Sequence, residues 1–154
     1  DHRCVGINGK NSEMHAAMGL CNLPRVEKLI SDRRDQFLRY HELIDDRNVV
    51  LPKPPTADFK HNYSYCPIIL PSEGALQSTM AHLESSGVVA RRYFYPSLNR
   101  LPYLSTTQSC PISEDIANRI MCLPMSEDVT PALQQRIATL ILESIAEAQL
   151  VAQL

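Results

Sequence analysis

The chain has 154 residues, 44% of them hydrophobic and 21% charged, with a formal net charge of −2. This is about one globular domain, without the basic surplus that nucleic-acid binding needs. The longest apolar run, residues 138–142, is far too short to cross a membrane, so we expect neither nucleic acid nor a membrane as a partner.

The first part of the chain predicts two consecutive helices. Asn11 or Ser12 can cap the first, and Asn22 with Pro24 begins a longer one that runs to about Ile44. Apolar residues recur at helical spacing in both. They are Met14, Ala17, Met18 and Cys21 in the first helix and Val26, Leu29, Ile30, Phe37, Tyr40 and Ile44 in the second.

From residue 49 onward, short strands alternate with helices. Runs of β-branched and aromatic residues predict strands at 63–70, 88–95 and 120–123, with a shorter candidate at 49–51. Pro67 indicates an edge position or a bulge in the strand at 63–70. Helices are expected at 73–85, at 114–119 and from 131 onward, capped by Ser72, Ser113 and Thr130, and Gly87 ends the first of these.

This order predicts an α/β fold: a small α/β domain at residues 49–154, preceded by a helical arm at residues 1–48. The helix at 24–44 is long for such a domain, and we expect it to pack on something besides the small sheet. Met14, Met18 and Ile30 are expected to be exposed and to make the chain prone to dimerise.

Cysteine and histidine patterns give no sign of a metal or redox site. The five cysteines, an odd number, stand at none of the spacings typical of zinc or disulfide-exchange motifs, and the five histidines show no ligand spacing. We therefore expect no bound metal, and reduced, mostly buried thiols in a cytoplasmic protein. The sequence also contains no nucleophile elbow of the G-x-S-x-G type.

Two segments have the composition of binding sites. Asn8 stands in a loop that leads into the first helix, where its amide and free backbone N–H groups can meet an anion; the alternative is a simple capped turn. In residues 90–96, strand alternation would place Arg91, Tyr93 and Tyr95 on one side, with Arg92 and Phe94 on the other. Such a segment can clamp a phosphate and stack on a base, or it can be an ordinary edge strand with solvated arginines.

Residues 8–20, with the sequence NGKNSEMHAAMGL, resemble the signature of the DegT/DnrJ/StrS family. These are pyridoxal-phosphate-dependent nucleotide-sugar aminotransferases of fold type I. Residues 33–40, 87–96 and 110–125 resemble further segments of that family in the same order. The resemblance implies a C-terminal small domain, with a small mixed or antiparallel sheet flanked by helices.

In that family the lysine that forms the Schiff base with pyridoxal phosphate lies upstream, with the aspartate that faces the pyridine nitrogen and the residue that stacks on the ring. The chain therefore resembles the C-terminal part of such an enzyme. The resemblance implies that it contains no catalytic residue and that it should not catalyse transamination alone.

The resemblance also assigns roles to residues outside the catalytic group. Asn8 matches the asparagine that reaches across the dimer interface to the cofactor phosphate, and Lys10 stands at a basic position near substrate or phosphate. Phe94 and Asn99 replace two histidines of the family pattern. The candidates for substrate contact in this region are Arg91, Tyr93 and Tyr95.

For the whole enzyme the resemblance implies a homodimer that moves an amino group to a dTDP- or UDP-linked keto sugar. The donor is an amino acid, usually glutamate, and the variant at residues 91–96 resembles a subgroup acting on dTDP-linked keto-6-deoxyhexoses, sugars found in lipopolysaccharide O-antigen. Two alternatives stay open. One is a sugar dehydratase of the same family, in which another residue replaces the lysine, and the other is a non-catalytic binding or dimerisation module.

Overall fold

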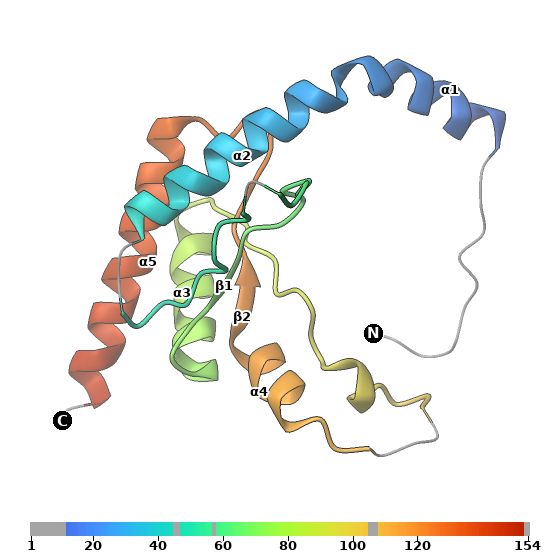
Figure 1. Cartoon of the computed structure of the whole chain (residues 1–154). Helices are drawn as coiled ribbons and strands as arrows, with labels where there is room; N and C mark the ends of the chain where they lie inside the picture. The colour runs from blue at the N-terminus through green and yellow to red at the C-terminus, as the bar shows by residue number, and fades with distance from the viewer. Residues whose placement is uncertain (1–11, 45–46, 57, 105–107, 153–154) are drawn as a thin grey trace.

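The computed structural model describes residues 12–44, 47–56, 58–104 and 108–152 (Figure 1). Two short strands and five helices carry the fold of this described part. The strands are β1 (Pro67–Ile69) and β2 (Ile120–Cys122). The helices are α1 (Glu13–Asn22), α2 (Val26–Leu43), α3 (Glu73–Ser85), α4 (Pro111–Arg119) and α5 (Pro131–Ala152), and single 3-10 turns lie at Leu23–Arg25 and Leu98–Arg100.

The sheet is antiparallel and narrow. In the ladder, Pro67 of β1 lies opposite Cys122 of β2. One further residue pair adds to each side, with Val50 opposite Ile69 and Arg91 opposite Cys122. The layer therefore runs from Val50 through β1 and β2 to Arg91, and the expected small antiparallel sheet is confirmed.

Three helices pack beside this layer. Figure 1 shows α3 and α5 side by side next to the strands, with α2 crossing α5 at one end. The Thr79 and Ser144 hydroxyls form a buried hydrogen bond of 3.0 Å between α3 and α5. Gln134 Nε2 of α5 donates to the Gln36 backbone oxygen of α2 at 2.9 Å. These polar contacts fix the register of helices that otherwise meet through apolar side chains.

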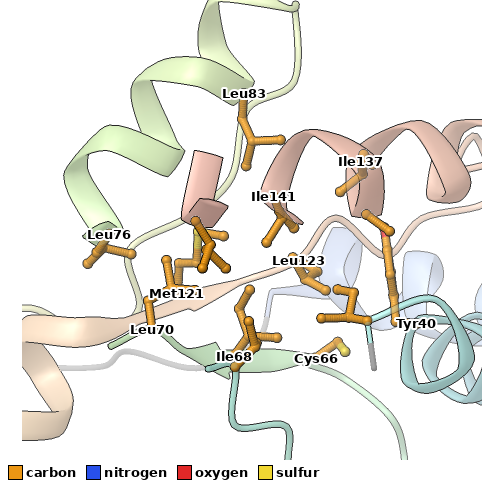
Figure 2. Close-up of a cluster of buried hydrophobic side chains, with 14 of the residues drawn as sticks. Tyr40, Cys66, Ile68, Leu70, Leu76, Leu83, Met121, Leu123, Ile137 and Ile141 are labelled. Carbon is orange, nitrogen blue, oxygen red and sulfur yellow. The ribbon is translucent and has the colours of Figure 1, made fainter. Parts of the chain in front are cut away.

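The hydrophobic core lies between the helices and the strands (Figure 2). Its fully buried members come from every packed element, because each element turns one apolar face inward. They include Tyr40 from α2, Ile68 from β1, Leu76 and Leu83 from α3, Met121 from β2, and Ile137 and Ile141 from α5. Tyr40 also donates its hydroxyl to the Pro124 backbone oxygen at 3.0 Å, which satisfies its polar end.

The helical arm leaves this core. In Figure 1, α1 extends beyond the rest of the described chain as a continuation of α2, and none of its residues is buried. Met14 is 74% exposed and Met18 is 61% exposed, as the sequence predicts, whereas Ile30 is half-buried, contrary to the expectation. Within the described residues, no helix is both long and apolar enough to cross a membrane.

The expected strand at 63–70 is much shorter than predicted. Tyr63 has a φ of +49°, in the left-handed region, which ends extended backbone there. Tyr63 N donates to His61 Nδ1 at 3.0 Å and Ser64 N to Asn62 Oδ1 at 3.1 Å, so local bonds replace a ladder. The edge position predicted for Pro67 is confirmed, because the ladder among the described residues contains only β1 and β2. On the side of β1 away from β2, only Ile69 is bridged, to Val50, so Pro67 needs no N–H there.

Two other predicted strands are wrong in length. The candidate at 49–51 is reduced to the single pair made by Val50, and the strand at 88–95 to the single pair made by Arg91. Tyr93 N donates back to the Arg91 backbone oxygen at 3.1 Å, and this tight turn ends the extended segment. The strand expected at 120–123 is confirmed as β2 within one residue.

Helix boundaries follow the sequence more closely. Ser72 Oγ accepts from Ala75 N at 3.1 Å, Thr130 Oγ1 accepts from Leu133 N at 3.2 Å, and both caps are confirmed. The expected helix at 114–119 begins earlier, at Pro111. Its predicted cap, Ser113, lies inside the first turn and bonds Ser97 Oγ at 2.8 Å instead.

Candidate substrate-binding site

Arg91 and Tyr93 form the centre of the candidate site. Arg91 Nη1 donates to Tyr93 Oη at 3.1 Å, and its Cζ lies 5.7 Å from the Tyr93 ring centroid. Arg91 is exposed, and no carboxylate among the described residues forms an ion pair with it. Within the described residues its positive charge is therefore not neutralised by a carboxylate, a state that suits an anionic ligand.

Three aromatic rings form a cluster that includes Tyr93, the hydrogen-bond partner of this arginine. Tyr93 and Phe94 stack with ring centroids 5.0 Å apart and planes at 19°. Tyr65 approaches both edge-on, 5.9 Å from Tyr93 and 6.5 Å from Phe94. Sequence analysis did not single out Tyr65, because the contact depends on how the segment before β1 passes the loop after α3. The sequence marks Tyr65 only as an aromatic residue two positions after Tyr63.

Arg92 and Tyr95 form a separate unit. Arg92 Nη2 lies 2.6 Å from Glu73 Oε1 and donates to the Asn118 backbone oxygen at 3.2 Å. Its Cζ is 3.5 Å from the Tyr95 ring centroid. The predicted alternation, with Tyr95 on the same side as Arg91 and Tyr93, is wrong because the chain turns at Tyr93 and brings Tyr95 back over Arg92.

Two cavities adjoin the aromatic cluster. The smaller, of about 310 Å³, has a mixed lining, in which Ser64, Tyr65, Arg91 and Ser126 lie beside apolar residues such as Val89 and Leu123. The larger, of about 810 Å³, lies between residues 93–98 and α4, and its walls are mainly apolar. Tyr93 lines both cavities, which are therefore neighbours.

Cys122 also lines the smaller cavity, where it is inert. Burial raises the pKa of its thiol, so the neutral form persists at physiological pH and the group does not act as a nucleophile. Metal binding finds no support in the described part of the chain, where no three histidine, cysteine or acidic residues come together as ligands. What the described residues of the site offer a ligand is therefore the positive charge of Arg91 and the aromatic rings of Tyr65, Tyr93 and Phe94.

Asn8 and Lys10 lie outside the described residues. The described lysines are Lys28, Lys53 and Lys60, and all three are exposed, with Lys28 paired to Asp32. A lysine that binds pyridoxal phosphate covalently needs a desolvated pocket. The described part of the chain therefore does not itself fit the covalent cofactor site.

The fold and the sequence together define a family. The chain belongs to the DegT/DnrJ/EryC1/StrS aminotransferase family, whose sequence profile matches residues 1–142. It is 30% identical over 144 residues to the dTDP-4-amino-4,6-dideoxy-D-glucose transaminase of Escherichia coli, covering 89% of this chain and 39% of that protein. It is 28% identical over 127 residues to the GDP-perosamine synthase of Vibrio cholerae, covering 80% and 34%.

Solved structures share the fold. DesI, determined in the presence of its TDP-sugar product, aligns with a TM-score of 0.79 and 28% identity over 96% of this chain and 39% of its own. The aminotransferase TlmJ from Streptoalloteichus hindustanus aligns with a TM-score of 0.81 at 18% identity over 90% of this chain and 38% of its own, a likeness of fold alone. The chain thus spans about 39% of the length of the first relatives it matches.

Proposed function

We propose that the whole protein is a pyridoxal-phosphate-dependent aminotransferase. It moves an amino group from an amino-acid donor, glutamate, to a dTDP- or UDP-linked keto-deoxysugar, with a dTDP-4-keto- or 3-keto-6-deoxyhexose as the favoured substrate. The observation that carries the proposal is the family match over residues 1–142, together with 30% identity to a dTDP-sugar transaminase. When bound, pyridoxal phosphate supplies the electron sink for amino transfer.

Residues of this chain contribute binding to that reaction. We propose that Asn8 donates its amide to the cofactor phosphate held by the partner subunit of a homodimer, with Lys10 near the same phosphate or the substrate. Arg91 and Tyr93 are proposed to contact the substrate, which their hydrogen bond and the adjoining cavity support. Tyr95 remains a weaker candidate, because it stacks on Arg92.

Residues 1–48 are proposed to act as an arm that links the small domain to the rest of the protein, and the full exposure of α1 supports this role. A cytoplasmic location and a role in lipopolysaccharide O-antigen synthesis belong to the same proposal. Two relatives, at 30% and 29% identity, are named as dTDP-sugar transaminases, which favours amino transfer over dehydration or a purely structural module.

The test uses the whole protein with pyridoxal phosphate, glutamate and a dTDP-4-keto-6-deoxyhexose or its 3-keto isomer. We expect a dTDP-amino sugar and 2-oxoglutarate in equal amounts by mass spectrometry, and neither product when glutamate is omitted. Loss of water from the sugar without glutamate consumption would instead identify a dehydratase. A dimer that produces neither change would identify a binding or dimerisation module.

The role of Asn8 is tested separately by cofactor binding. We expect Asn8→Ala to weaken the affinity of the whole protein for pyridoxal phosphate, because the phosphate loses one hydrogen bond. Asn22→Ala is the matched control, since Asn22 is an exposed asparagine at the far end of α1. Equal affinities in the two variants would contradict the assignment.

A further inference from the structure

Two neighbouring arginines have opposite roles in this structure. Arg92 is held by Glu73, by the Asn118 carbonyl and by the ring of Tyr95. Arg91 has a hydrogen bond to Tyr93 and no carboxylate partner among the described side chains. A cation left unneutralised at the edge of a cavity is a favourable place for the negative charge of a ligand.

The larger, apolar cavity, which Tyr93 also lines, is a groove with an exposed apolar rim. Its rim carries Phe94, Leu98 and Ile112, which are 65%, 70% and 76% exposed. The groove lies between the yellow segment that follows α3 and the orange helix α4 (Figure 1). Its volume of about 810 Å³ is within the range of small-molecule sites, and exposed apolar surface of this kind marks places where something binds.

Tyr93 joins the two features. Its hydroxyl accepts from Arg91, which lines the smaller cavity, and its ring stacks on Phe94 at the wall of the apolar groove. A ligand that fits both sides has a flat, largely apolar ring at one end and a strongly anionic group next to it. A nucleoside diphosphate has this combination, because every base has a face that stacks on aromatic side chains.

We propose that the apolar groove between residues 93–98 and α4 binds the base of the nucleotide sugar, stacked on Phe94, while Arg91 binds its diphosphate. The inference rests on the proposed function, from which it takes the substrate class, and it adds a base subsite formed by Phe94 and Ile112. Phe94 stands where the family pattern has a histidine, so the replacement supplies a ring suited to stacking rather than a titratable group.

The experiment measures the affinity of the whole, cofactor-loaded protein for dTDP and for inorganic pyrophosphate by calorimetry. We expect Phe94→Ala and Ile112→Ser to weaken dTDP binding, roughly 5- to 150-fold for the loss of stacking at Phe94, and to leave pyrophosphate binding unchanged. Arg91→Gln is expected to weaken both ligands. Leu150→Ala is the matched control, since Leu150 on α5 is also 65% exposed and lies outside both cavities.

Unchanged dTDP affinity in Phe94→Ala and Ile112→Ser would overturn the proposal and would mean that another part of the protein or a second copy covers the groove. Equal losses in Leu150→Ala would overturn it as well. Because Phe94 and Ile112 are exposed, their variants are expected to unfold at the same urea concentration as the unsubstituted protein.

Amino-transfer kinetics separate this inference from the proposed function. We expect Phe94→Ala to raise KM for the nucleotide sugar at unchanged kcat, because the base contact is the same in the ground and transition states. Normal amino transfer with unchanged KM in this variant would leave the proposed function intact and remove the base subsite. Failure of the unsubstituted protein to transfer an amino group would remove the proposed function, whatever the dTDP measurements give.

Discussion

The guanidinium carbon of Arg92 lies 3.5 Å from the centroid of the Tyr95 ring, three residues further along the chain. The same guanidinium reaches Glu73 at the start of α3 and the backbone of Asn118 near the end of α4. One side chain therefore fastens the loop after α3 to two helices. Tyr93, which lines both cavities, and Phe94, which lines the larger one, lie between Arg92 and Tyr95 in this fastened loop.

Arg92→Ala is expected to lower the free energy of unfolding by about 2 kcal/mol, because it removes a cation–π contact and two hydrogen bonds from a mostly buried side chain. Arg92→Lys should recover part of the loss, since it keeps the charge without the planar fork. Urea denaturation measures the free energy of unfolding of both variants. Arg34→Ala, on the exposed face of α2, is the control and should change stability by less than about 0.5 kcal/mol.

Stability is expected to fall in alkali because of Cys66. Burial raises the pKa of its thiol from 9.0 to about 12, so above pH 9 the unfolded chain releases a proton that the folded chain keeps. The contribution of this thiol to the free energy of unfolding is complete below pH 9. It is lost as pH rises toward 12, at about 1.4 kcal/mol per pH unit. Burial raises the pKa of Tyr40 and Cys122 as well, with the same sign.

Cys66→Ala tests this directly. Urea unfolding between pH 8 and 10.5 should give a shallower decline of stability than in the unsubstituted protein, by about one proton. Some decline should remain, because Tyr40 and Cys122 still contribute. An unchanged slope would show that Cys66 ionises as readily in the folded state as in the unfolded chain.

Glu114 is expected to hold the loop before α4. Its carboxylate accepts from Arg100 at 2.6 Å, from Asn99 at 2.7 Å and from Cys110 N at 2.9 Å, and these bonds lower its pKa from 4.5 to about 2. The contribution of Glu114 to the free energy of unfolding is present above pH 4.5 and is lost as pH falls toward 2. The reason is that, as pH falls, the carboxylate takes up a proton in the unfolded chain before it does so in the folded one.

Glu114→Gln should therefore release the loop at neutral pH. We expect tryptic cleavage after Arg100 to become roughly two- to fivefold faster, as measured by mass spectrometry. Asp115→Asn is the matched control, because Asp115 pairs with Arg119 inside α4 and does not contact the loop. Faster cleavage in the control variant would contradict the role of Glu114.

The exposed arm is expected to drive association. A double variant, Met14→Lys with Met18→Lys, should remove the concentration-dependent dimer in sedimentation experiments, because both methionines are largely exposed on one face of α1. Ala16→Lys with Gly19→Lys adds the same charge on the opposite face of the helix and should leave the dimer intact. A compact monomer of the unsubstituted chain at high concentration would contradict this prediction.

Helices could be predicted from the sequence because their signals are local. Ser72 and Gly87 bracket α3, and the cap bond to Ala75 and the φ of +78° at Gly87 show both residues in the predicted roles. Strands could not be bounded in the same way. Tyr63 belongs to a run with high strand propensity, yet bonds to neighbouring side chains set its backbone, and propensity does not detect them.

The candidate site was predicted in part. Arg91 and Tyr93 interact as the pattern indicated, because they are two residues apart and need no distant partner. The different role of Arg92 depends on Glu73, which lies 19 residues earlier in the chain and on another element. No spacing rule within residues 90–96 specifies such a contact, so the two arginines look equivalent in the sequence and differ in the structure.

The narrow sheet has a consequence for solubility. Each border of the layer consists of a single bridged position, Val50 on one side and Arg91 on the other. A foreign strand would need several consecutive unpaired N–H and C=O groups as a template, and these borders offer no continuous row. Within the described residues, the layer therefore presents little template for edge-to-edge polymerisation of the kind that leads to amyloid, and the charged side chain of Arg91 stands at one of its two borders.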